Sequence, residues 1–218
     1  MKTGILFDLD GTLLDTLQDL LAATNAALRQ FDRPQRTLEE LRRFVGNGAR
    51  NQLRLALSGR DDDPDLDAAL EWYKVYYAAH CQNQTAPYPG ITEMLEALRG
   101  RWPMAIVSNK PDQAVKTLCA AHFPGIYALG EAPDCPRKPA PDMVYKAMAA
   151  IGVEKCIYVG DSEVDIRTAK NAGVPCVSVL WGFRDREVLE NEGGRYFCER
   201  AGALPALLEE ICRGDSEK

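Results

Sequence analysis

Two aspartates, Asp8 and Asp10, end a short apolar run near the start of the chain. A run of this length that is followed by a glycine predicts a buried strand. Residues two apart on an extended chain point to the same side, so we expect both carboxylates to face whatever lies beyond the strand. Two ionised carboxylates this close repel each other unless a cation or a shared proton compensates. The pair therefore predicts a metal site or an acid/base pair.

Other polar residues follow apolar runs later in the chain: Ser108, Lys138, Asp161 and Asp165. If these runs are parallel strands, their carboxyl ends meet at one edge of a sheet, where ligands of such sheets bind. Each residue alone could be a turn residue, a helix cap or a surface lysine. Caps, however, do not require apolar strands to bring several acids, a hydroxyl and a lysine to one edge. The combination predicts an acidic pocket.

The segments that position these residues alternate between short apolar runs and amphipathic helices. We expect an opening strand from Ile5 and further strands at residues 104–107, 126–129, 156–159, 176–180 and 195–198. Strands separated by helices predict an α/β fold, a Rossmann-like doubly wound parallel sheet with helices on both faces.

One stretch departs from this alternation, because its apolar residues have helical spacing throughout. Helices are expected at residues 16–31, 37–45 and 49–57, followed by a long helix that ends near Cys81. Thr37 and Glu40 form a capping box at the start of the second of these helices. The pattern predicts an inserted all-helical cap domain at residues 16–84 and an α/β core at residues 1–15 and 85–218.

Composition narrows the classes of function. The chain has 218 residues, 27% of them charged, and a formal net charge of −6. An acidic protein of this kind is not expected to bind nucleic acid or an anionic membrane, since both need basic patches. Seven cysteines without a C-x-x-C pair and two isolated histidines fit reduced thiols and argue against zinc. No cleavable signal or membrane-spanning segment is apparent, and we expect a cytoplasmic protein.

The acids, the hydroxyl and the lysine together indicate phosphoryl chemistry. Hard carboxylate oxygens without histidine or nearby thiols favour Mg²⁺ as the cofactor, and Mg²⁺ keeps positions for water and a phosphate oxygen. A phosphoryl group held by the metal would meet the Ser108 hydroxyl and the Lys138 ammonium on its other oxygens. Such a clamp is what phosphoryl transfer needs.

Four motifs carry a resemblance to a known family: residues 8–12 (DLDGT), 107–111 (VSNKP), 138–142 (KPAPD) and 160–165 (GDSEVD). In this order they resemble the haloacid dehalogenase superfamily, most closely the phosphoglycolate-phosphatase-like members with a helical cap of the C1 type. The subfamily resemblance rests mainly on residues 46–50 (GNGAR) and on the form of the second motif. The resemblance covers nearly the whole chain.

The resemblance implies a Mg²⁺-dependent phosphatase of small phosphate monoesters. Asp8 would be the nucleophile that forms an aspartyl-phosphate, and Asp10 the group that protonates the leaving oxygen and later accepts a proton from water. The metal would be held by Asp8, the Asp10 carbonyl and Asp161, with Asp165 in direct or water-mediated support. Ser108 and Lys138 would bind the phosphoryl oxygens, and Thr12 and Asn109 stand beside them in the motifs as further substrate-binding residues.

Substrate recognition is expected in the cap. The break at Asn47 and Gly48 exposes backbone amides at the start of the following helix, which is a natural seat for an anion. Arg50 lies in the first turn of that helix and could bind a second anionic group of the substrate. Under this interpretation 2-phosphoglycolate is the favoured substrate; otherwise the glycines only end a helix and Arg50 is solvated.

Other functions stay open at this point. A phosphomutase or a pyrophosphatase could use the same scaffold. A receiver domain also gathers acids, a hydroxyl and a lysine at parallel strand ends, although the helical insertion and the Asp8/Asp10 pair argue against it. A small-molecule phosphate ester is the expected partner, and the chain is expected to be a monomer or a homodimer.

Overall fold

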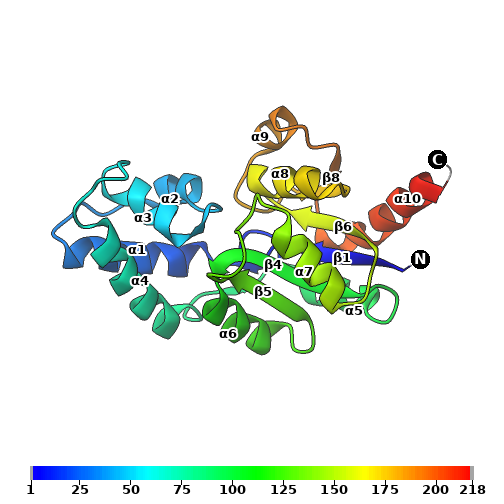
Figure 1. Ribbon diagram of the computed structural model, residues 1–218, viewed down its shortest axis with the longest axis horizontal. Coiled ribbons are helices and arrows are strands. Elements are labelled where there is room, and N and C mark those ends of the chain that lie inside the picture. Colours follow the sequence, from blue (N-terminus) through cyan, green and yellow to red (C-terminus); the bar gives the residue numbers. More distant parts are fainter. Residues whose placement is uncertain (1, 217–218) are drawn as a thin grey trace.

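The computed structural model describes residues 2–216, and a parallel sheet forms its centre (Figure 1). The strand order is β5-β4-β1-β6-β7-β8, and every neighbouring pair is parallel. The strands are β1 Thr3–Phe7, β4 Met104–Pro111, β5 Tyr127–Glu131, β6 Lys155–Gly160, β7 Cys176–Val179 and β8 Tyr196–Cys198. β1 lies in the middle with Ile5 level with Met104 of β4 and Ile157 of β6, so its end meets theirs at one edge.

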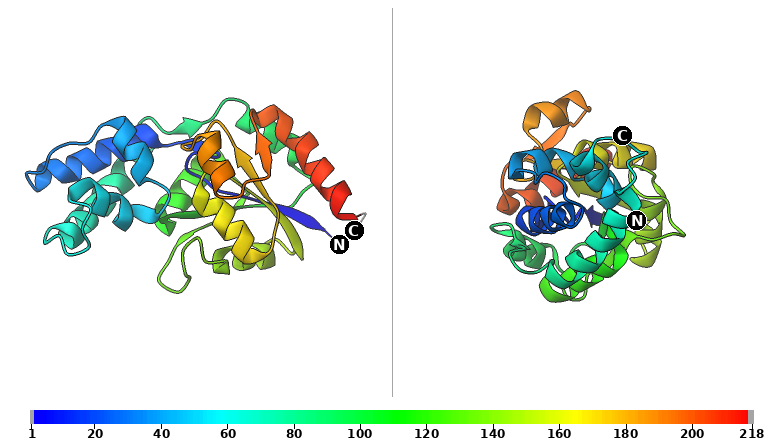
Figure 2. Two further views of the ribbon diagram at one scale, coloured as in Figure 1. Left: turned by 90° about the horizontal axis from the view of Figure 1, so that it is seen from above. Right: turned by 90° about the vertical axis from the view of Figure 1, so that its left-hand side faces the viewer.

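Helices cover both faces of the sheet (Figure 2). Alternate strand residues separate the two cores: Ile5 and Phe7 face one apolar cluster, and Leu6 faces the other. The first cluster contains side chains of three core helices, α5 Ile91–Leu98, α6 Asp112–His122 and α10 Leu204–Ser216. The second contains those of α7 Asp142–Ala150 and α8 Glu163–Ala172. The expected α/β fold with a doubly wound parallel sheet is therefore confirmed.

A group of four helices, the helical unit, lies at the opposite end of the molecule from the two termini (Figure 1). Its members are α1 Leu17–Gln30, α2 Leu38–Phe44, α3 Gly48–Leu57 and α4 Leu66–His80. They bury an apolar stripe against one another, for example Leu20, Leu53 and Tyr73. The capping box of Thr37 and Glu40 is present at the start of α2. All four helices agree with the periodicity of the sequence.

Two short strands join the helical unit to the sheet. β2 (Leu14–Asp15) leads into α1, β3 (Ala86–Pro87) returns from α4, and the two pair antiparallel. The sequence did not indicate them, because two residues cannot show a period. The helix α9 (Arg186–Asn191) and the short helix η1 (Ala201–Ala203) were likewise not expected. β4 is longer than expected, and its pairing with β5 shifts register between Val107 and Pro111.

Asp19, in the first turn of α1, links the two connections between the helical unit and the sheet through hydrogen bonds. Its buried carboxylate accepts hydrogen bonds from the backbone amides of Gln84 and Thr85 at 2.9–3.0 Å and from the Thr85 hydroxyl at 2.8 Å. The start of the helical unit is thereby tied to the segment that leaves it.

Among residues 2–216, no helix is both long enough and apolar enough to cross a membrane.

Replacing Asp19 by Ala should destabilise the protein, because two backbone amides and a hydroxyl would lose their acceptor in a buried place. We expect a loss of about 3 kcal/mol in the free energy of unfolding, measured by urea unfolding followed by circular dichroism. Asp67→Ala is the matched control, since Asp67 is exposed and its loss should change stability by less than about 0.5 kcal/mol. Equal stabilities of the two variants would contradict the fastening role.

Candidate functional site

The predicted polar residues meet in one cavity at the carboxyl edge of the sheet. Asp8 and Asp10 follow β1, Ser108 lies near the end of β4, and Asp161 follows β6. Lys138 comes from the loop between β5 and α7, and all five residues line the same cavity. The other side of the cavity is formed by the helical unit, through residues of α3 and α4 and the turn between α2 and α3. The cavity volume is about 40 Å³, which is room for a few water molecules.

Lys138 lies at the base of this cavity with its side chain almost fully buried. Its ammonium is 2.8 Å from the Asp8 carboxylate, 2.8 Å from the Asp165 carboxylate and 3.0 Å from the Tyr158 hydroxyl. Burial disfavours the ammonium, but Asp165 and Asp8 outweigh this and hold the pKa of Lys138 well above its usual value. Lys138 is therefore a fixed positive charge between two acids.

Asp161 and Asp165 are held by the protein on both oxygens. Asp161 accepts hydrogen bonds from the Phe183 backbone amide at 2.7 Å and from the Thr12 hydroxyl at 3.2 Å. Asp165 accepts from Lys138 on one oxygen and from the Ser162 hydroxyl, at 2.6 Å, on the other. This places Thr12 behind the carboxylate of Asp161, not among the residues that line the cavity.

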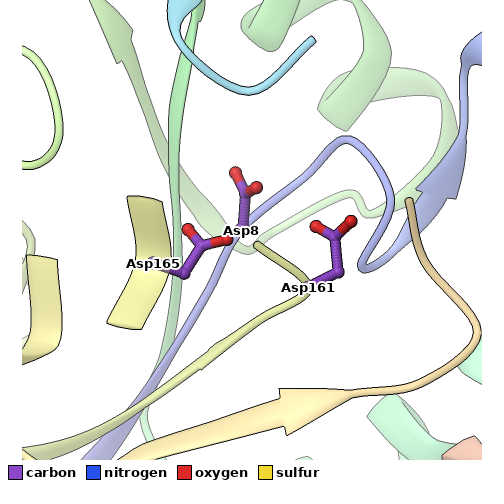
Figure 3. A group of neighbouring side chains, drawn as sticks. All are labelled: Asp8, Asp161 and Asp165. Atoms are coloured by element: carbon purple, nitrogen blue, oxygen red, sulfur yellow. The ribbon is translucent and has the colours of Figure 1, made fainter. Parts of the chain in front are cut away.

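The three acids Asp8, Asp161 and Asp165 form a group that could hold a metal ion (Figure 3). One carboxylate oxygen from each lies within 4.8 Å of the others, and all three residues are buried. Burial raises the pKa of Asp8 well above its usual value; Lys138 opposes this rise, whereas Asp165 and Asp161 add to it. Burial and the charge of Asp165 raise the pKa of Asp161 to about 7. The excess negative charge and the all-oxygen donors fit a divalent cation.

Close approach of the backbone shapes this cluster at two glycines. A Cβ on Gly11, which has a positive φ of 84°, would come within 2.3 Å of an Asp161 oxygen. A Cβ on Gly160 would come within 2.3 Å of the Asp165 carboxyl carbon. Only residues without side chains leave the two carboxylates room beside β1 and β6.

Asp10 has a partner that the sequence interpretation did not assign. The Lys110 ammonium is 2.7 and 3.0 Å from the two Asp10 oxygens, and it lies over the ring of Tyr77, 4.7 Å from its centroid. Tyr77 comes from α4 of the helical unit. Lys110 could have been noticed in the sequence, since it stands two residues after Ser108 in the second motif. Its contact with Tyr77 could not, because nothing in the sequence places α4 next to β4.

Some of the predicted substrate-binding residues line the cavity and others do not. Gly48 lines the cavity, as does Asn109, whose side-chain amide also binds the Lys138 backbone and the Gly46 carbonyl. Asn47 precedes α3 as its N-cap and does not line the cavity. Arg50 lies in a neighbouring groove and pairs with Asp67 of α4. Its role as a substrate ligand stays a prediction, and its guanidinium is engaged elsewhere in this arrangement.

Two arginines that sequence reasoning missed join the helical unit to the loop that supports Asp161. Arg184 pairs with Glu163 at 2.8 Å and donates to the backbone carbonyls of Arg42 and Val45. In return, Arg42 of α2 donates to the Phe183 carbonyl at 2.6 Å. No motif marked these contacts, because they join positions more than 130 residues apart in the chain.

Known proteins are similar to this chain in both sequence and fold. The phosphoglycolate phosphatase of Pseudomonas putida is 34% identical over 86% of this chain and 73% of its own length. That of Agrobacterium fabrum is 33% identical, covering 94% and 92%. A solved structure from Lactobacillus delbrueckii subsp. bulgaricus, provisionally named phosphoglycolate phosphatase, is 37% identical with a TM-score of 0.84, covering 94% of this chain and 97% of that one.

A family model agrees with these relatives. The model of haloacid dehalogenase-like hydrolases matches residues 5–179, which include most of β1, the helical unit, Lys138 and both acids that follow β6. Asp8, Asp10, Ser108, Lys138 and Asp161 thus lie within the matched part and line one cavity. The chain belongs to the haloacid dehalogenase-like hydrolase family.

Proposed function

We propose that this protein is a Mg²⁺-dependent phosphatase of small phosphate monoesters, with 2-phosphoglycolate as the favoured substrate. The observation that carries the proposal is the buried Lys138 ammonium between Asp8 and Asp165, with Asp161 beside them in a lidded cavity. A fixed cation beside a nucleophilic carboxylate is suited to the charge that develops on a transferring phosphoryl group. The names of the relatives support the choice of substrate.

In the proposed reaction, an Asp8 oxygen attacks the phosphorus while the bond to the leaving oxygen breaks. Asp10, which lines the same cavity, gives a proton to that leaving oxygen. Asp10 then takes a proton from a water molecule that attacks the phosphorus of the aspartyl-phosphate, releasing inorganic phosphate and restoring Asp8.

Other side chains would hold the phosphoryl group during these steps. Lys138 would balance its negative charge. The Ser108 oxygen accepts a hydrogen bond from the Lys110 amide at 3.2 Å, so its own proton is available to a phosphoryl oxygen.

Asp8 and Asp161, with the Asp10 carbonyl, are the proposed ligands of Mg²⁺. When bound, the cation would neutralise the acidic cluster and part of the phosphoryl charge. Asp165 is the weaker ligand of the set, because one of its oxygens pairs with the Lys138 ammonium and the other accepts from Ser162, whereas Asp161 accepts only from uncharged donors. We therefore propose that Asp165 supports the metal indirectly.

We also propose that residues 16–84 act as a cap that opens and closes. The cavity lies between the sheet and the helical unit, whose residues line its far side, so a movement of this unit away from the sheet would widen the way in for a substrate. The paired connections β2 and β3 are the place where such a motion would occur.

A panel of substrates tests the function as a whole. Purified protein with Mg²⁺ should release phosphate faster from 2-phosphoglycolate than from pyrophosphate, a sugar phosphate or p-nitrophenyl phosphate. Preference for pyrophosphate, or isomerisation of the sugar phosphate, would favour one of the other activities on this scaffold. Phosphorylation of the protein without turnover would indicate a signalling module.

Asp8→Asn should abolish turnover, because the amide is a poor nucleophile while its volume is nearly unchanged. We expect kcat to fall by about 1,000-fold or more, with circular dichroism spectra like those of the wild type. Asp134→Asn, at an exposed position, is the matched control and should keep full activity. Substantial phosphate release by Asp8→Asn would exclude the covalent mechanism.

Asp10→Asn should slow both halves of the reaction, because one group serves both proton transfers. Rapid-quench experiments with radiolabelled substrate should show slower formation and slower breakdown of the phosphorylated protein, each by about 100-fold. A normal rate for either step would remove Asp10 from that step.

Asp161→Asn should stabilise the metal-free protein and remove its response to Mg²⁺. A folded pKa of about 7, above the unfolded value of 3.8, means that this group costs stability as pH rises from about 4 through 7. At pH 8 in EDTA, the neutral amide should therefore raise the melting temperature by about 3 °C, while its oxygen still accepts from Phe183. Mg²⁺ should raise the melting temperature of the wild type only, as measured by scanning fluorimetry. A lower melting temperature of the variant in EDTA would contradict the repulsion described above.

A further inference from the structure

Lys110 is a buried cation inside the cavity with donor capacity left over. Its side chain is 3% exposed, and its ammonium has one charged partner, the Asp10 carboxylate. An ammonium carries three donor protons, and two are enough for the two Asp10 oxygens. The ammonium also lies 4.7 Å from the centroid of the Tyr77 ring, but within the described residues its third proton has no oxygen or nitrogen acceptor.

The other cations that line the cavity have more protein partners than Lys110. Lys138 uses its three protons on Asp8, Asp165 and Tyr158. Arg184 binds Glu163 and two backbone carbonyls of the helical unit. Of the cavity cations, Lys110 hydrogen-bonds to the fewest protein groups, and it is the one best placed to accept a further anionic partner.

Tyr77 supplies an independent sign of a missing partner at the same place. Within residues 2–216, four buried side-chain polar atoms have no hydrogen-bond partner, and of these residues only Tyr77 lines the cavity. Burial, followed by the charge of Asp10, raises the pKa of Tyr77 well above its usual value. The hydroxyl thus keeps its proton, and a buried donor of this kind is costly unless a ligand accepts from it.

We propose that Lys110 and Tyr77 form the receptor for a second anionic group of the substrate, a carboxylate that lies one carbon away from the leaving oxygen. This inference rests on the proposed function, which puts the phosphoryl group at Asp8 and the leaving oxygen at Asp10. Because Lys110 is in hydrogen-bond contact with Asp10, a carboxylate beyond the leaving oxygen reaches the same ammonium. The substrate class is then short phosphorylated hydroxy acids.

The two parts of the receptor come from different parts of the chain. Lys110 belongs to β4, and Tyr77 belongs to α4 of the helical unit. The carboxylate therefore gains its second partner only when the helical unit is closed over the sheet. A substrate without this group would close the cavity less well, and its reaction would be slower.

Two substrates that differ only at this group test the proposal: 2-phosphoglycolate and ethyl phosphate, which has a methyl group in place of the carboxylate. The quantity to measure is the ratio of their kcat/KM values. Lys110→Met should lower this ratio about 100-fold, and Tyr77→Phe about 10-fold. Lys74→Met and Tyr76→Phe, on the same helix as Tyr77 but outside the cavity, should leave the ratio unchanged.

Equal losses on both substrates in Lys110→Met would overturn the proposal, because Lys110 would then act only by holding Asp10. Loss of the ratio in Arg50→Ala, with none in Lys110→Met, would move the receptor to the start of α3 and also overturn it. If the wild type hydrolyses neither substrate, the proposed function itself fails. The three failures are therefore distinguishable.

Binding to a variant that cannot turn over separates recognition from proton transfer by Asp10. In the Asp8→Asn background, titration calorimetry should show that Lys110→Met lowers the affinity for 2-phosphoglycolate by about 100-fold and the affinity for inorganic phosphate by less than about 3-fold. Thermal unfolding of the same samples shows whether the double variant is folded. Unchanged affinity for 2-phosphoglycolate in folded protein would overturn the assignment of Lys110.

Discussion

The positive charge of Lys138 is the constraint on which the arrangement of the site depends. Asp8 and Asp165 approach the same buried point, and without a cation between them their repulsion and desolvation would push the end of β1 and the start of α8 apart or neutralise an acid. Tyr158, rising from β6, fixes the ammonium from below and donates in turn to the Val107 carbonyl. One side chain from a loop thus joins the end of β1, strand β6 and the first turn of α8, and its own charge is maintained by its partners.

The lysine compensates only part of the negative charge, and the remainder defines what the site attracts. Asp161 has hydrogen bonds but no lysine, and its raised pKa reflects burial beside Asp165. A divalent cation and a phosphate dianion together are a suitable complement for such a pocket. The chemistry follows from this imbalance of charge more than from any single catalytic group.

The sequence predicted the sheet and its acidic edge because these features have local signals. Asp8, Ser108 and Asp161 each end an apolar run, and parallel topology then brings the ends together. The partnership of Lys110 with Tyr77 had no such signal, since it depends on how the helical unit lies over β4. The pairing of Arg50 with Asp67 had no signal in the sequence either, because the direction of a side chain on a helix depends on how the helix packs, and the role of Arg50 toward the substrate stays a prediction.

The peptide unit of Phe183 connects the acidic cluster with the helical unit. Its amide binds Asp161, and its carbonyl binds Arg42 of the helical unit. Both hydrogen bonds of this peptide unit can form together only when Asp161 is in place and the helical unit lies against the sheet. The position of Asp161 and the position of the helical unit are therefore energetically coupled. If Asp161 binds an ion and the helical unit moves as proposed, reciprocity requires that tighter ion binding at Asp161 favours the closed position of the helical unit, and that a looser helical unit binds the ion less tightly. The affinity for the ion and the closed fraction of the protein would then be coupled through one peptide unit.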